Sequence, residues 1–214
     1  MVSERASILF FVKFPERGQV KTRLAAAFGD DAALTLYQSF VAHLQITLNT
    51  CGRPWTIYYA PAEARDRMRA WLGTGNTYTA QRGSDLGERM MNAFQDAFRT
   101  GVEQAILIGS DVPAITEDIL NEGLRSLQHS EAVVGPAMDG GYYLIGFNAN
   151  SFQPQAFEHI EWSTDTVFER TMDILSRRGQ RVHVLPTLRD IDTPDDLEAH
   201  LKTIASRCSE QRHP

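Results

Sequence analysis

Short apolar segments alternate with amphipathic segments along most of the chain, and this alternation restricts the fold more than any other feature of the sequence. Continuous apolar runs predict strands over residues 8–14, 55–60 and 105–108. Apolar residues at helical spacing predict helices over residues 34–48, 65–72, 86–97 and 116–127. Strands that alternate with helices imply one α/β sandwich around a mostly parallel sheet.

The pattern changes after residue 131, where two strands, over 132–135 and 142–147, are expected to flank a turn. Ser163 or Thr164 is expected to cap a helix that ends before Gly179. A strand is predicted over 182–185, and Thr193, followed by proline and early acids, predicts the start of the last helix. Residues 1–207 are therefore predicted to form one domain, with residues 208–214 as a frayed tail.

The charge balance and the apolar pattern exclude several classes of protein. With 21 basic and 27 acidic residues the net charge is −6, which argues against a general binder of nucleic acid or acidic membranes but allows a local basic pocket. No apolar run reaches the ~18 residues needed to cross a bilayer. Cys51 and Cys208 lie far apart without CxxC spacing, so neither a disulfide framework nor a cysteine zinc site is expected. We expect a cytoplasmic protein.

A basic loop follows the first predicted strand, where α/β proteins bind ligands at the carboxyl ends of their strands. Residues 13–24 hold four cations, Lys13, Arg17, Lys21 and Arg23, and Gly18 lets the backbone come close to a ligand. The loop is not a P-loop, because Val20 stands where that motif requires glycine. A solvated basic loop is the alternative, but the position and the clustering favour phosphate binding.

Carboxylates follow two other predicted strands. Asp111 comes directly after 105–108, and Asp190 and Asp192 share one face of an extended segment after 182–185. Asp111 could instead cap a turn. Asp190 and Asp192 could instead place favourable negative charge at the N-terminus of the last helix, although Asp195 and Asp196 are better placed for that role. We predict that Asp111, Asp190 and Asp192 bind one divalent cation, since without a cation they would repel and raise at least one pKa.

Two further glycine-containing loops are candidates for ligand contact. Asp139, Gly140 and Gly141 are first of all a tight turn, but the tyrosines that follow, Tyr142 and Tyr143, suit an acceptor pocket. Gln81 and Gly83 precede a helix, where the backbone could approach a nucleotide or could simply turn into the helix.

Six segments in this order, KFPERGQVKTRL, QRGSDLGERM, GSDVP, GPAMDGGYYLIG, WST and DIDTPDDL, resemble the bacterial DUF2064-type proteins, which are often labelled glycosyltransferase-like. The resemblance runs from about residue 7 to residue 200. It implies a single Rossmann-like α/β/α sandwich of the GT-A (nucleotide-diphospho-sugar transferase) superfamily, with a mostly parallel mixed sheet. That superfamily also contains molybdenum-cofactor nucleotidyltransferases and the guanylyltransferases of 2-phospholactate or phosphoenolpyruvate.

The resemblance also implies roles for particular residues. It places the phosphate loop on Lys13, Gly18, Lys21 and Arg23, and the metal-binding acids on Asp111, Asp190 and Asp192. From the loop patterns described above, and not from the resemblance, Gln81 and Gly83 are expected to contact the nucleotide, and Asp139, Gly140, Gly141 and Tyr142 the acceptor. Lys21 and Asp111 are the expected catalytic residues. Glycosyltransferases have a mid-chain DxD, but the first acid is missing here, where Ser110 precedes Asp111. This difference argues against glycosyl transfer without excluding it.

The expected function is transfer of a nucleotidyl group from a nucleoside triphosphate to a small phosphorylated or carboxylated acceptor, with Mg²⁺ (or Mn²⁺) as cofactor. Glycosyl transfer from a nucleotide sugar is the first alternative, and a non-catalytic nucleotide-binding module is the second. The expected partners are the nucleotide and a small-molecule acceptor, with neither nucleic acid nor membrane, and a homodimer is left open.

Overall fold

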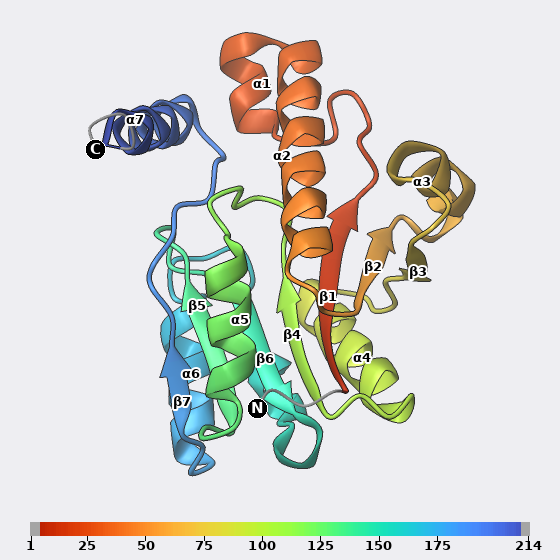
Figure 1. The fold of residues 1–214 in the computed structure, drawn as a ribbon, viewed down its shortest axis with the longest axis vertical. Helices are drawn as coiled ribbons and strands as arrows, with labels where there is room; N and C mark the ends of the chain where they lie inside the picture. Colours follow the sequence, from red (N-terminus) through yellow and green to blue (C-terminus); the bar gives the residue numbers. More distant parts are fainter. Residues whose placement is uncertain (1–4, 211–214) are drawn as a thin grey trace.

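Helices cover both faces of a seven-stranded sheet (Figure 1). The structure is a computed structural model that describes residues 5–210 and their side chains through residue 206. The strands are β1 (Ala6–Lys13), β2 (Trp55–Ala60), β3 (Thr77–Ala80), β4 (Gln104–Ile108), β5 (Ala132–Pro136), β6 (Tyr142–Asn148) and β7 (Val182–Val184). Their order is β3-β2-β1-β4-β6-β5-β7, and β6 is antiparallel to both of its neighbours while the other pairs are parallel. The predicted single α/β sandwich with a mixed, mostly parallel sheet is confirmed.

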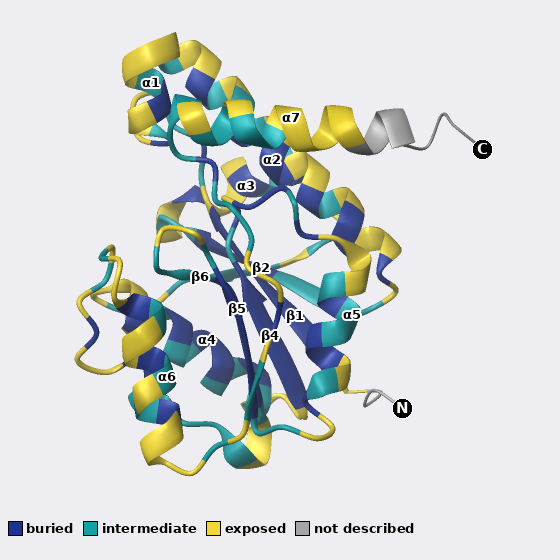
Figure 2. Cartoon of the chain, turned by 90° about the vertical axis from the view of Figure 1, so that its left-hand side faces the viewer, coloured by how far each residue is buried: buried dark blue, intermediate teal, exposed yellow. Residues whose placement is uncertain are grey.

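Two apolar cores lie on the two faces of this sheet (Figure 2). The helices are α1 (Thr22–Phe28), α2 (Asp30–Thr50), α3 (Arg65–Leu72), α4 (Leu86–Arg99), α5 (Glu117–Ser126), α6 (Val167–Arg177) and α7 (Pro194–Glu210). Alternate residues of β1 divide between the faces, since Ile8 and Phe10 pack with α2, α3 and α5, whereas Leu9 and Phe11 pack with α4 and α6. No helix within residues 5–210 is both long and apolar enough to cross a membrane.

The sheet has its topological switch point between β1 and β4. From β1 the chain moves outward through β2 and β3, and it then returns to form β4 on the other side of β1. Connections therefore leave these two parallel neighbours in opposite directions, which leaves a crevice at their carboxyl ends. Lys13 ends β1 at this crevice, and Gly109 to Asp111 follow β4 there.

Three local predictions were wrong or incomplete. The basic loop ends early, because α1 begins at Thr22, and β3 was not predicted at all. Neither Ser163 nor Thr164 caps α6, which begins at Val167 after Thr166; Ser163 instead has a positive φ of 65°.

The start of the last helix is as predicted. Asp196 N donates to Thr193 Oγ1 (3.3 Å), and Thr193 N donates to Asp196 Oδ2 (3.0 Å), which is a reciprocal capping box. Helix α7 extends to Glu210 and so includes the first residues of the expected tail, while residues 211–214 lie outside the described part of the chain.

Candidate active site

A cleft of about 390 Å³ opens at the carboxyl ends of β1 and β4. Its charged lining residues include Lys13 from β1, Asp111 after β4, Asp139 from the turn between β5 and β6, and Asp190 and Asp192 from the segment before α7. These residues come from four separate parts of the sequence. The topology thus gathers at one place the charged groups that the sequence singled out.

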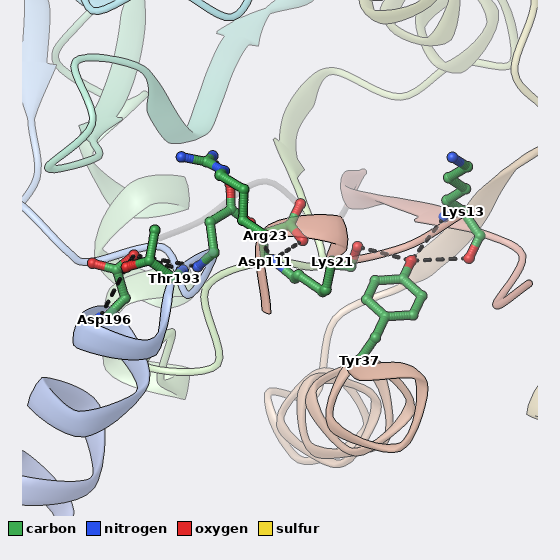
Figure 3. Close-up of polar contacts among 9 residues, drawn as sticks. Lys13, Lys21, Arg23, Tyr37, Asp111, Thr193 and Asp196 are labelled. Atoms are coloured by element: carbon green, nitrogen blue, oxygen red, sulfur yellow. Dashed lines mark hydrogen bonds and ion pairs between the residues drawn. The ribbon is translucent and has the colours of Figure 1, made fainter. Parts of the chain in front are cut away.

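The Lys21 ammonium joins two of these carboxylates (Figure 3). It pairs with Asp111 and also with Asp192 Oδ1, at 2.8 Å, and its side chain is only 3% exposed. Lys21 precedes α1 in a left-handed conformation (φ 49°, ψ 46°), which is uncommon for a residue with a side chain. Burial alone would lower the pKa of Lys21, but attraction to the two carboxylates outweighs burial and raises it.

The other three cations of the basic loop have different surroundings. Arg23 pairs with Asp192, so that carboxylate faces two cations. The Lys13 ammonium donates to the Gln19 carbonyl oxygen (2.7 Å) across the loop. Arg17 is directed to α2, where its Nε lies 2.7 Å from Asp31 Oδ1. Lys13 therefore lines the cleft, and Lys21 and Arg23 pair with carboxylates that line it, whereas Arg17 is held elsewhere.

Backbone hydrogen bonds bring the segment before α7 to the cleft. Leu188 N donates to the Pro136 carbonyl oxygen (3.1 Å) and Met138 N donates to that of Leu188 (3.0 Å), so the segment extends the edge of β5. Ile191 N then donates to the Asp111 carbonyl oxygen (3.0 Å). These hydrogen bonds place Asp190 and Asp192, on either side of Ile191, next to the loop after β4.

Asp190 carries negative charge that no cation offsets. Burial, with the charges of Asp139 and Asp192, raises its pKa to about 6. Asp190 forms no ion pair with any other residue in the described range 5–210. Within that range no three Asp, Glu, His or Cys side chains are grouped closely enough to hold a metal ion. The site on Asp111, Asp190 and Asp192 stays a prediction, and in this structure Lys21 lies between two of its members.

Tyr37 of α2 joins the loop after β1 to the loop after β4, whereas the sequence pattern indicates only an apolar helix position for it. Its hydroxyl accepts from Lys13 N (3.0 Å), donates to the Lys13 carbonyl oxygen (2.9 Å) and lies 3.2 Å from Ser110 Oγ. Burial and the charge of Asp111 raise its pKa, so the hydroxyl stays neutral. A tyrosine at a core position requires a polar partner, and that requirement is the signal for this contact.

The remaining predicted residues fall into two groups. Gln81, Gly141 and Tyr142 line the cleft, as does Asp139, whose Oδ1 accepts from Gly141 N at 2.9 Å. Three predicted glycines do not line it, and their local structure is as follows: Gly18 (φ 72°) approaches the Asp30 side chain, Gly83 (φ 144°) packs on the backbone of α4, and Gly140 (φ 88°) packs on the backbone of Asp165. Ligand contact by these three stays a prediction.

Several solved structures share this fold. A protein from Desulfovibrio desulfuricans G20, whose assignment as a nucleotide-diphospho-sugar transferase is provisional, is 42% identical with a TM-score of 0.90, over 93% of this chain and 87% of its own. CMP:2-keto-3-deoxy-manno-octonic acid synthetase in complex with CTP is 10% identical with a TM-score of 0.58, over 94% and 99%. Rv0371C from Mycobacterium tuberculosis H37Rv, in complex with manganese, is 12% identical with a TM-score of 0.55, over 92% and 98%.

The two distant structures show only that the fold is shared. This fold is the one found in the nucleotide-diphospho-sugar transferase-like protein that is 42% identical. A search of curated proteins finds no match. The family model described as "Uncharacterized protein conserved in bacteria (DUF2064)" matches residues 44–164, more than half of the chain. Together with the relative that is 42% identical over almost the whole chain, this match shows that the protein belongs to the DUF2064 family.

Proposed function

We propose that the protein is a nucleotidyltransferase that uses a nucleoside triphosphate and a divalent cation. The observation that carries this proposal is the cluster of Lys21 and Arg23 with Asp111 and Asp192 at the switch point of the sheet. Cations bind phosphate oxygens, and carboxylates bind a hard cation that accompanies phosphates. One of the structures with this fold is a synthetase in complex with CTP, and this likeness supports a nucleotide as the ligand.

The cleft offers the oxygen donors that Mg²⁺ or Mn²⁺ prefers, and an ion bound there would draw together carboxylates that are not closely grouped among the described residues of this structure. Asp111, Asp190 and Asp192 offer carboxylate oxygens only, and the raised pKa of Asp190 reflects negative charge for which a cation would compensate. These three residues would hold the ion, which supplies charge neutralisation at the phosphates. A manganese complex of the distantly similar Rv0371C supports this choice of cofactor.

The protein's own groups position the triphosphate. Lys13, Lys21 and Arg23 bind its oxygens, and this fixes the α-phosphorus for in-line attack by the acceptor with pyrophosphate as the leaving group. When the triphosphate binds, the ammonium of Lys21 exchanges part of its attraction to Asp111 and Asp192 for attraction to phosphate. Tyr37 joins the loops that carry Lys13 and Asp111 through its contacts with the Lys13 backbone and Ser110.

Glycosyl transfer from a nucleotide-diphospho-sugar is the second candidate, because the relative that is 42% identical carries a provisional assignment as such a transferase. The two reactions differ in their leaving group. Nucleotidyl transfer releases pyrophosphate from the triphosphate, whereas glycosyl transfer releases a nucleoside diphosphate from the sugar donor.

The test is product analysis by ³¹P NMR after incubation with each nucleoside triphosphate or nucleotide sugar, Mg²⁺ and a panel of acceptors. Pyrophosphate that appears with wild-type protein and not with Lys21→Met supports the proposal. Nucleoside diphosphate from a sugar donor would replace it with glycosyl transfer. Nucleotide binding that needs no Mg²⁺ and gives no product would favour the non-catalytic module.

A further inference from the structure

The WST motif, which the proposed reaction does not use, forms part of the second half of the cleft. Trp162 lines this half together with Leu86 and Met90 of α4, Tyr142 of β6 and Val167 of α6, and we call these five residues the Trp162 wall. Trp162 is half-buried and Leu86 is 44% exposed, so the wall presents apolar surface to the cleft and is not closed into the core.

The surrounding chain is shaped to hold Trp162 in this place. At Gly87, in the first turn of α4, an added Cβ would lie 2.6 Å from Cζ2 of Trp162, so the helix has no side chain where the indole packs. The same Cβ would lie 2.5 Å from the Phe157 carbonyl oxygen. Glycine inside a helix costs about 1 kcal/mol relative to alanine, and here these two close contacts account for it. The Tyr142 ring meets Trp162 edge to face, with centroids 6.4 Å apart and planes at 85°.

The loop that carries Trp162 is also fitted to the turn between β5 and β6. A Cβ on Gly140 would lie 2.1 Å from the Asp165 carbonyl oxygen, and Phe168 N donates to the Gly140 carbonyl oxygen at 2.8 Å. The glycine of this turn is therefore required by the approach of the loop as well as by its φ of 88°. The turn and the Trp162 loop form one unit that borders the cleft.

Acidic residues outnumber basic residues along the cleft. Of the described residues that line it, Lys13 is the only cation, whereas Asp111, Asp139, Asp190 and Asp192 are acidic. The Lys13 ammonium donates to the Gln19 carbonyl oxygen, within the loop assigned to the phosphates. An anionic group against the Trp162 wall would therefore enter a cleft lined by four carboxylates and this one cation.

We infer that the Trp162 wall binds an uncharged, ring-shaped part of the acceptor, with an apolar face toward the indole and hydroxyl groups toward Asp139 and Ser163. The inference rests on the proposed function, because it names the acceptor class of that reaction. It replaces the phosphorylated or carboxylated acceptor expected from sequence with a neutral hydroxyl-bearing one. Flat rings bind aromatic faces well, and carboxylate oxygens accept hydrogen bonds from hydroxyl groups.

The test uses matched neutral and anionic probes. Binding of methyl hexosides and methyl pentosides, and of the corresponding sugar 1-phosphates and uronic acids, is measured by saturation-transfer NMR with a nucleoside triphosphate and Mg²⁺ present. We expect the neutral glycosides to bind about tenfold or more tightly than their anionic counterparts. Trp162→Ala should weaken glycoside binding about 5- to 150-fold, the range for loss of one stacked ring, and Trp162→Phe should retain most of it.

Two charge variants test the same inference at exposed positions, where folding is not at risk. Leu86→Lys adds a cation to the wall and should raise the affinity for sugar 1-phosphates. Met138→Lys, at a residue that is 57% exposed and does not line the cleft, should change neither class of probe. Equal or tighter binding of the anionic probes by wild-type protein would overturn the inference, as would no glycoside binding up to the solubility limit.

Nucleotide affinity, measured by calorimetry in the same variants, separates this inference from the proposed function. Loss of nucleoside triphosphate binding in Trp162→Ala, with glycoside binding intact, would assign the wall to the base and overturn the inference. Glycoside binding that depends on Trp162 in a protein that never releases pyrophosphate would leave the wall assigned and remove only the proposed reaction.

Discussion

Lys21→Met removes the buried ammonium that joins Asp111 and Asp192 and keeps an unbranched side chain of similar length. The two carboxylates then lose their shared cation, and only Arg23 remains on Asp192. Loss of one partner from a fully buried charge pair costs about 3–5 kcal/mol. Here the side chains of Asp111 and Asp192 are 53% and 29% exposed, so water stabilises them in part. We therefore expect a loss of about 1–2 kcal/mol in the free energy of unfolding.

For a domain of this size, such a loss lowers the melting temperature by about 2–8 °C. The measurement is thermal unfolding followed by circular dichroism at pH 7.5, with and without Mg²⁺. If Asp111 and Asp192 are metal ligands, Mg²⁺ should stabilise Lys21→Met more than wild type, because the ion no longer competes with the ammonium. The double variant Lys21→Met/Asp111→Asn should lose most of that extra stabilisation.

Lys202→Met is the control, because Lys202 pairs with Glu198 on α7 and both side chains are well exposed. We expect no measurable change in its melting temperature or in its response to Mg²⁺. An unchanged melting temperature in Lys21→Met would refute the stabilising role given to the ammonium. Equal Mg²⁺ responses in Lys21→Met and wild type would refute the assignment of the carboxylates as metal ligands.

Three further substitutions test other parts of the account. Asp190→Asn should stabilise the metal-free protein by about 1–2 kcal/mol at pH 7, because burial and nearby acids disfavour the charged carboxylate and raise its pKa in the folded state to about 6. As the pH falls, native wild-type protein binds a proton at Asp190, so the advantage of the variant should vanish toward pH 4. Denaturant titrations at several pH values would show a pH-independent difference if this is wrong. Tyr37→Phe should lower the free energy of unfolding by about 1–2 kcal/mol and weaken nucleotide binding, because it removes the hydroxyl between Lys13 and Ser110. An unchanged nucleotide affinity in calorimetry would argue against the positioning role of Tyr37. Gly140→Ala should lower the melting temperature more than Gly101→Ala does. Both glycines have φ near 90°, but of the two only Gly140 closely approaches other backbone atoms. Equal decreases in melting temperature would contradict this packing argument.

The fold was largely predictable because its strands are short, apolar and buried. The run that forms β4 is fully buried, and the helical spacing of Tyr37, Val41 and Leu44 follows the buried face of α2. Strand β3 was missed because its four residues lie at the sheet edge, with none fully buried. Helix α1 was missed because it has no side-chain cap and follows a left-handed residue.

The candidate site was predictable in its members more than in their pairing. Rules for parallel sheets place Asp111 and Asp192 at one end of the sheet. No local pattern shows that Lys21, which is 171 residues from Asp192 along the chain, lies between these two carboxylates. The contact between Tyr37 and the two loops is equally long-range, as is the packing of Trp162 on Gly87. Sequence spacing reports local geometry, whereas these contacts depend on how distant segments meet.

Binding of nucleoside triphosphates tests the central claim most directly. Isothermal titration calorimetry with each triphosphate and Mg²⁺ should find at least one that binds wild-type protein and loses most of its affinity in Arg23→Glu, while Arg17→Glu, at the cation held by α2, binds nearly as wild type does. Because Arg23 is exposed, the variant should fold, and its melting temperature in the absence of nucleotide measures the cost of placing a glutamate beside Asp192. Equal affinities in wild type and Arg23→Glu, or no binding of any triphosphate with Mg²⁺, would contradict the account.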